Sequence, residues 1–93
     1  MNNSTQIVMY SKEYCPYCRM ARQLLDNKGV DYQLIDIEGK HELRERMIEL
    51  SGRRTVPQIF VGDHHVGGFD DINALERKGK LDALLGDTAG ASA

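Results

Sequence analysis

The chain has two cysteines, Cys15 and Cys18, and they are separated by two residues shortly after the apolar run 7–10. Pro16 follows the first cysteine, and the first turn of a helix accepts proline because its missing N–H would have no intrahelical partner there. The pattern predicts a strand over residues 6–10 and a helix over 16–28. Cys15 then lies at the helix N-terminus, where unpaired N–H groups favour a thiolate. We expect Cys15 to be a nucleophile and Cys18, one turn later, to be a shielded, protonated resolving thiol.

Ninety-three residues predict one domain, which we place at residues 1–86, with a tail over 87–93 that lacks an apolar pattern and is expected to be disordered. The formal net charge is −2, and acidic and basic residues are mixed along the chain. The sequence therefore predicts no basic face, which argues against a nucleic-acid partner. No run approaches the ~20 apolar residues of a membrane span, and the N-terminus lacks the features of a signal peptide. We therefore expect a cytoplasmic protein without a membrane partner, in which a lone C-x-x-C pair is redox-active or metal-binding.

After the first helix, alternation of apolar and polar residues predicts a strand over 30–37, and helical spacing predicts a second helix over 40–51. Strand, helix and strand in succession imply a right-handed parallel crossover. The buried stripe of the second helix is expected to contain Leu43, Met47, Ile48 and Leu50. We also place four side chains of the apolar stripes in the core: Met9, Met20, Met47 and Phe60.

The C-terminal half predicts a β-hairpin followed by a helix. Runs 58–61 and 65–67 flank a glycine-containing turn and form two antiparallel strands. Asp70 or Asp71 can cap the helix that comes next. The order β-α-β-α-β-β-α predicts an α/β domain with a four-stranded mixed sheet flanked by helices. A C-x-x-C pair at the end of the first strand lies where open α/β sheets place their ligands.

This arrangement is thioredoxin-like, and from about residue 6 to residue 85 the chain resembles a dithiol glutaredoxin of the short bacterial type. Three motifs carry the resemblance: Cys15-Pro16-Tyr17-Cys18, Thr55-Val56-Pro57 and Gly67-Gly68-Phe69-Asp70-Asp71. The resemblance implies a thioredoxin-like fold and a glutathione-dependent thiol–disulfide oxidoreductase that reduces glutathione mixed disulfides and protein disulfides and supplies electrons to reductive enzymes. Glutathione would be the co-substrate, with no tightly bound cofactor. The expected partners are glutathione and disulfide-containing or glutathionylated proteins, and the expected state is a monomer.

The resemblance also implies a glutathione site. Pro57 is expected to be cis and to turn the main chain of Val56 toward a bound cysteinyl peptide. Thr55 is expected to hydrogen-bond the ligand or the loop. Tyr17 would flank the groove, and Gly68 would let the backbone pass close to the ligand.

The charged ends of glutathione need partners as well. Lys12 resembles the family lysine that meets the glycyl carboxylate, with Arg44 assisting. The N–H groups of Phe69 and Asp70 would receive the γ-glutamyl α-carboxylate at a helix start, and the carboxylate of Asp70 or Asp71 would meet the ammonium group. Phe69 replaces a cysteine often found at this position in relatives. The roles of three cations near the sites remain open: Arg19 as a neighbour of Cys15, and the pair 53–54 as solvated charges or as guides for anionic substrates.

Other functions for the cysteine pair are less favoured. A metal site needs further ligands, but His64 and His65 are expected at the end of the sheet opposite Cys15, and His41 begins the second helix, so we expect none. A glutaredoxin that carries an iron–sulfur cluster between two subunits remains an alternative, although Pro16 disfavours it within the family. A redoxin supplied by thioredoxin reductase is disfavoured by Lys12, Tyr17 and the segment 67–71.

Overall fold

The computed structural model describes residues 6–86 and contains four strands and four helices in this region. The predicted tail over 87–93 lies outside the described residues. In chain order the elements are β1 (Ile7–Ser11), α1 (Pro16–Asn27), β2 (Gln33–Asp36), α2 (His41–Ser51), β3 (Gln58–Val61), β4 (His64–Gly67), α3 (Phe69–Arg77) and α4 (Leu81–Gly86). Within these residues no helix is both long and apolar enough to cross a membrane.

The strands form one mixed sheet in the order β2-β1-β3-β4. β1 pairs in parallel with β2 and antiparallel with β3, and β3 pairs antiparallel with β4. The predicted four-stranded mixed sheet and hairpin are therefore confirmed. The carboxyl end of β1 leads into α1, as required for a cysteine pair at the edge of the sheet.

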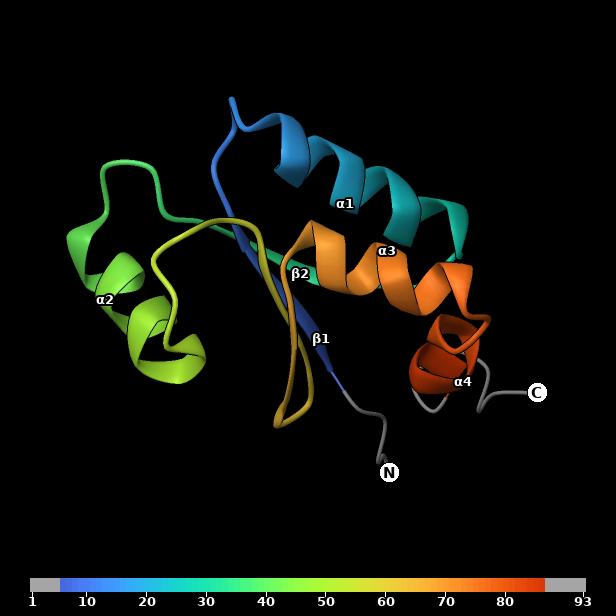
Figure 1. Ribbon diagram of the computed structural model, residues 1–93. Coiled ribbons are helices and arrows are strands. Elements are labelled where there is room, and N and C mark those ends of the chain that lie inside the picture. The colour runs from blue at the N-terminus through green and yellow to red at the C-terminus, as the bar shows by residue number, and fades with distance from the viewer. Residues whose placement is uncertain (1–5, 87–93) are drawn as a thin grey trace.

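Helices cover both faces of the sheet. Alternate residues of β1 point to opposite sides, so Ile7 and Met9 join α1, α3 and α4 in one core cluster, whereas Val8 and Tyr10 pack with α2 in the other. Figure 1 shows α1 and α3 side by side on one side of the sheet and α2 apart from them. This arrangement brings the N-terminal ends of α1 and α3 to the same region of the molecule.

Local sequence explains where two of the helices end. Lys28 closes α1, and Gly29 follows it with φ +71°. Gly52 closes α2 with φ 73°, and its N–H donates to the carbonyl of Ile48. Glycine adopts this left-handed conformation at no steric cost, which makes it the usual stop for a helix. The predicted ends of both helices are confirmed to within one residue.

Three sequence predictions of burial and length were wrong. Met20 and Leu50 are each 46% exposed, although both were expected to be buried. The buried stripe of α1 consists of Cys18, Ala21 and Leu25, with Met20 to one side of it. Leu50 lies in the last turn of α2, to one side of the helix face on which Met47 is buried. The strand expected over 30–37 is shorter, and only Gln33–Asp36 are in register with β1, although the Ile37 N–H still donates to the Ser11 carbonyl.

Candidate active site

Cys15 and Cys18 occupy different environments at the start of α1. Cys15 is the N-cap residue, with extended backbone at φ −101° and ψ 117°, and its sulfur accepts a hydrogen bond from the N–H of Cys18 at 3.4 Å. The Cys15 side chain is partly exposed, whereas Cys18 is buried. The first sulfur can thus meet a substrate while the second lies behind it.

Burial raises the pKa of the Cys18 thiol to about 12, because the apolar surroundings disfavour the thiolate. The thiol therefore keeps its proton at neutral pH, as the sequence predicted. A backbone hydrogen bond from Lys12 lowers this pKa in part, which places the Lys12 main chain beside the buried sulfur. The Cys18 thiol can attack only once it has lost that proton.

The loop before β3 lies against Cys15. The thiol of Cys15 is 3.8 Å from the carbonyl oxygen of Val56, and the bond between Val56 and Pro57 is cis, as the resemblance implied. The backbone of this loop is therefore part of the surroundings of the reactive sulfur.

A buried glutamine at the start of β3 holds the loop before this strand in place. The Gln58 side chain is fully buried, and its Nε2 donates to the carbonyl oxygen of Thr55 at 3.0 Å and to the Thr55 hydroxyl at 3.3 Å. Its Oε1 lies 2.7 Å from Nε2 of His65. Because this oxygen can only accept, the ring nitrogen of His65 must carry the hydrogen. Thr55 is thus tied to β3 and, through Gln58, to β4.

The start of α3 is held by Asp71. One oxygen of its carboxylate, Oδ2, accepts the N–H of Gly68 at 2.9 Å and also Nη1 of Arg53 at 2.9 Å. The hydrogen bond from Arg53 is the main cause that lowers the pKa of Asp71, followed by that from Gly68. A side chain at Gly67, where φ is +122°, would collide with the same carboxylate. Asp70, in contrast, is exposed.

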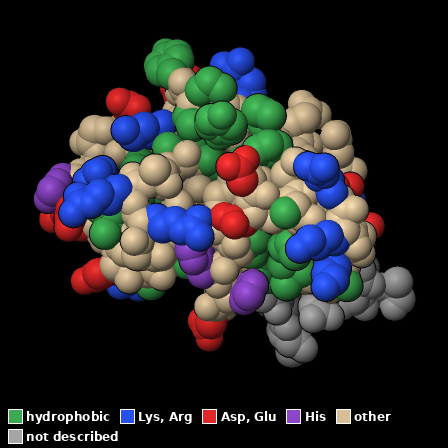
Figure 2. All heavy atoms as spheres, in the orientation of Figure 1, with side chains coloured by type: hydrophobic (Ala, Val, Ile, Leu, Met, Phe, Trp, Pro, Cys, Tyr) green, Lys and Arg blue, Asp and Glu red, His purple; other side chains and the backbone are tan. Residues whose placement is uncertain are grey.

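A cavity of about 330 Å³ lies beside Cys15, between α1, the loop before β3 and the start of α3. It is lined by Tyr17, Arg53, Thr55, Val56, Pro57, Gly68, Phe69, Asp70 and Asp71. The rings of Tyr17 and Phe69 lie 6.3 Å apart between their centres. Figure 2 shows hydrophobic side chains gathered over the N-terminal ends of α1 and α3, with acidic side chains next to them.

The structure brings together most of the residues singled out in the sequence. Eight of the predicted glutathione-site residues line this cavity, but Lys12 and Arg44 do not. Lys12 follows β1, and Arg44 is half-buried on α2. Their roles therefore remain predictions that rest on the resemblance alone.

Two contributions were missed or misplaced by sequence reasoning. Gln58 was treated only as part of a strand, although a polar residue at the head of an apolar run was a hint of a buried hydrogen bond. His65 was expected at the far end of the sheet, but its ring contacts Gln58, directly after Pro57. That prediction was wrong for His65, which lies within β4 opposite Phe60 and contacts the Gln58 side chain of the neighbouring strand. Burial lowers the pKa of His65.

No three His, Cys, Asp or Glu side chains come together within residues 6–86 in a way that could hold a metal ion. The two sulfur atoms themselves carry the chemistry that the geometry supports. A partly exposed sulfur at a helix N-terminus, with a protonated thiol behind it, is an arrangement suited to thiol–disulfide exchange.

Sequence comparison identifies relatives over most of the chain. Residues 7–66 match the family profile described as Glutaredoxin. A glutaredoxin of Pseudomonas aeruginosa is 57% identical over 79 residues, which are 85% of this chain and 94% of that protein. Glutaredoxin 3 of Escherichia coli K12 is 52% identical over 79 residues, covering 85% of this chain and 95% of that protein.

Solved structures agree with the sequence comparison. The solution structure of a glutaredoxin from Brucella melitensis has a TM-score of 0.79 and 49% identity, covering 90% of this chain and 91% of that chain. The crystal structure of a buckwheat glutaredoxin–glutathione complex has a TM-score of 0.82 and 34% identity, covering 91% of this chain and 83% of that chain. The geometry around Cys15 and these matches together establish that the chain belongs to the glutaredoxin family, a family of thiol–disulfide oxidoreductases.

Proposed function

We propose that the protein uses glutathione to reduce glutathionylated proteins, with Cys15 as the nucleophile. The observation that carries the proposal is the position of Cys15 at the edge of the cavity, next to Val56. The Cys15 thiolate attacks the glutathione sulfur of the mixed disulfide, and the bond between the two substrate sulfurs breaks. The protein thiolate leaves and takes up a proton. A second glutathione thiolate then attacks the glutathione bound to Cys15, releasing glutathione disulfide and the Cys15 thiolate.

A protein disulfide requires Cys18 as well. After Cys15 has attacked one sulfur of the substrate, Cys18 loses its proton and attacks Cys15. A disulfide between Cys15 and Cys18 forms, and the substrate leaves with both of its cysteines reduced. Two glutathione molecules then reduce the enzyme and become glutathione disulfide. The high pKa of Cys18 keeps it from competing with glutathione in the first reaction.

The cavity offers partners for the cysteinyl and γ-glutamyl parts of glutathione. The main chain of Val56 can pair with the cysteinyl residue, and Tyr17 can pack against it. At the start of α3, the N–H groups of Phe69 and Asp70 can receive the γ-glutamyl carboxylate. Asp71 is already engaged by Gly68 and Arg53, so we assign the ammonium group to Asp70, which is exposed.

The remaining glutathione contacts and the cellular setting follow from the same proposal. The glycyl carboxylate would meet Lys12, with help from Arg44. Thr55 would hold the loop in place, because its carbonyl oxygen accepts a hydrogen bond from the Gln58 side chain. The buckwheat relative has been solved as a glutathione complex, which supports this ligand. The proposed reaction needs a reducing glutathione pool, and we therefore propose that the enzyme works in the cytoplasm. We also propose that it acts as a monomer on disulfide-containing and glutathionylated proteins.

A coupled assay tests the proposal. With a glutathionylated peptide, glutathione and glutathione reductase, the wild type should turn over, Cys15→Ser should be inactive, and Cys18→Ser should stay active. With a peptide that contains an internal disulfide, Cys18→Ser should lose most of its rate. Activity of Cys15→Ser, or turnover of the wild type only with thioredoxin reductase, would refute the assignment.

A further inference from the structure

A glutathionylated protein has two halves, and the cavity beside Cys15 accounts for only one of them. If glutathione occupies the cavity lined by Tyr17 and Phe69, the protein half must lie on another side of Cys15. The side of α1 that faces α3 is then filled by glutathione, which leaves the side that faces β2 for the polypeptide. The path of this second half of the substrate rests on the proposed function.

A second cavity lies on that side of α1. Its volume is about 370 Å³, and it lies between α1 and the edge strand β2. We call it the α1–β2 groove, and its lining residues are Arg19, Arg22, Gln23, Asp26, Tyr32 and Leu34. None of them also lines the cavity beside Cys15.

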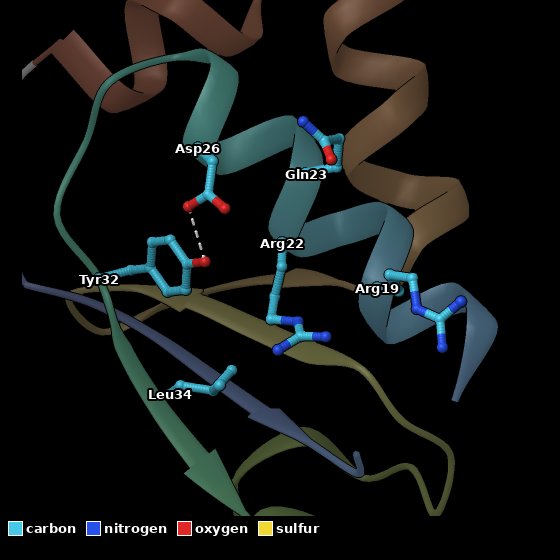
Figure 3. Close-up of a pocket in the computed structure, with 6 residues that line it drawn as sticks. All are labelled: Arg19, Arg22, Gln23, Asp26, Tyr32 and Leu34. Carbon is cyan, nitrogen blue, oxygen red and sulfur yellow. Dashed lines mark hydrogen bonds between the residues drawn. The ribbon is translucent and has the colours of Figure 1, made fainter. Parts of the chain in front are cut away.

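The α1–β2 groove begins next to the reactive cysteine. Arg19 is four residues after Cys15, and its N–H donates to the Cys15 carbonyl. Arg22 is seven residues after Cys15, which puts all three residues on one side of the helix. In Figure 3, Arg22 extends from α1 toward the sheet, between Leu34 and Arg19. A polypeptide whose modified cysteine lies beside Cys15 during the attack therefore meets first Arg19 and then Arg22 if it runs along the helix.

The charges of the α1–β2 groove favour an anionic ligand. Arg22 is half-buried, and neither it nor Arg19 forms an ion pair in the described part of the chain. The carboxylate of Asp26, in contrast, accepts a hydrogen bond from the Tyr32 hydroxyl at 2.9 Å. Two unpaired guanidinium groups therefore lie close to Cys15, and the acidic group at the far end has a partner. The side chain of Leu34, 43% exposed, adds an apolar contact.

We propose that the α1–β2 groove binds an acidic, extended segment of the protein substrate, with a carboxylate close to the modified cysteine. Seven residues of helix span about 10 Å, and an extended chain advances about 3.3 Å per residue. The preferred Asp or Glu is therefore about three residues from the modified cysteine. An apolar side chain next to it would lie on Leu34, and further acidic residues would approach Asp26 and be disfavoured.

Peptide pairs test this proposal directly. Two glutathionylated peptides are compared that differ in one residue, Glu or Gln, three positions from the modified cysteine. We expect the wild type to have about fivefold higher kcat/KM for the Glu peptide at low salt, with the preference falling as salt screens the arginines. Arg22→Gln should lose most of the preference, and Arg22→Glu should reverse it. Arg22 is chosen for substitution because a change at Arg19, one helical turn from Cys15, would also alter the surroundings of the reactive sulfur.

Arg46→Gln and Arg46→Glu are the matched controls, since Arg46 is exposed on α2, on the other face of the sheet. Both controls make the same change in net charge and should keep the wild-type preference, whereas an equal loss in the Arg22 and Arg46 series would show a general charge effect and overturn the proposal. Equal kcat/KM of the wild type for both peptides would also overturn it while leaving the proposed function intact. A wild type that turns over neither peptide would instead refute the proposed function.

Discussion

Cys15 and Cys18 differ at the scale of single residues although they share one turn of helix. Cys15 caps the helix and is partly exposed, and Cys18 is buried among the side chains that α1 turns toward the sheet. The apolar surroundings raise the pKa of Cys18 to about 12. This difference in exposure supports the proposal that Cys15 makes the first attack and that Cys18 acts in the second step.

A difference titration measures the state of Cys18. In Cys15→Ser, the ultraviolet absorbance of the Cys18 thiolate should appear only at alkaline pH, with a midpoint well above the ordinary value of 9.0, because burial, the largest cause of the raised pKa, remains in this variant. The variant lacking both cysteines serves as the blank and subtracts the tyrosines. Because the folded pKa lies above the unfolded one, the protonated thiol stabilises the fold below pH 9, and this contribution is lost as the pH rises toward 12. A midpoint near 9 would contradict the burial argument.

Sequence alone identified the residues of the motifs but not those that hold them in place. Cys15 stands out because its spacing to Cys18 places it at a helix start, and Tyr17, Pro57 and Phe69 stand out because they lie in the motifs that carry the family resemblance. Gln58 does not, since its role depends on hydrogen bonds to Thr55 and to a histidine on the next strand. Such contacts leave no periodic trace in a sequence, and a polar residue in a short strand is usually at the surface.

At the scale of elements, the start of α3 depends on a side chain from inside its own first turn. Asp71 accepts the N–H of Gly68, and Arg53 reaches the same carboxylate from the loop after α2. The sequence left Asp70 and Asp71 as equal candidates for a cap. Their spacing to the first helical residue differs by one, and only the backbone course through Gly67 and Gly68 decides between them.

Matched alanine substitutions separate the two aspartates. Asp71→Ala should lower the free energy of unfolding by about 1 kcal/mol, because it removes the bond that caps α3. Asp70→Ala should unfold like the wild type but raise the KM for glutathione, since we assign it to the ammonium group. Urea denaturation and the coupled assay measure the two effects. The idea fails if Asp70→Ala is the less stable variant and Asp71→Ala is the one with only a KM defect.

Element boundaries show what local pattern can and cannot predict. The limits of α1 and α2 follow from Pro16, Gly29 and Gly52, whose backbone preferences are local. The length of β2 depends on which of its residues are in register with β1, a pairing between separate segments that no residue of β2 encodes alone. Met20 and Leu50 were misplaced for a similar reason. Apolar residues at helical spacing show which face of a helix points to the core, but not how much of its circumference the rest of the protein covers.

At the scale of the whole molecule, one sheet separates two apolar clusters. Met9 and Met47 are both fully buried, but Met9 lies in the cluster under α1 and Met47 in the cluster under α2. The strands β1 and β3 contribute side chains to both clusters. We therefore expect the two sides to unfold together, as small single domains usually do.

Substitutions in the two clusters test this cooperativity. Met9→Ala and Met47→Ala should each lower the free energy of unfolding by about 2–5 kcal/mol, the usual cost of such a truncation in a core. Urea transitions followed by helix content and by tyrosine fluorescence should coincide in both variants. Separate transitions for the two probes in Met47→Ala would show that the α2 side unfolds on its own.

Acid should weaken the fold in two steps, because two pKa values are lowered by folding. His65 is held neutral by burial, so its contribution is lost as the pH falls from 6.5 toward its lower folded pKa. Asp71 is held ionised by Arg53, so its contribution is lost as the pH falls below 3.8. His65→Gln can still donate to Gln58 and should abolish only the first step in the free energy of unfolding plotted against pH. An unchanged first step in that variant would contradict the assignment to His65.

The two cavities that flank α1 have no lining residue in common. A glutathione mixed disulfide joins two unlike molecules, and each of them would be recognised in a different cavity of the enzyme. If the α1–β2 groove binds the protein substrate as proposed, changes at Arg22 or Leu34 would alter the choice of protein substrate without changing the cavity proposed for glutathione. Substitutions meant to change protein specificity therefore belong on the β2 side of α1, and the residues on the α3 side should be kept so that glutathione binding is preserved.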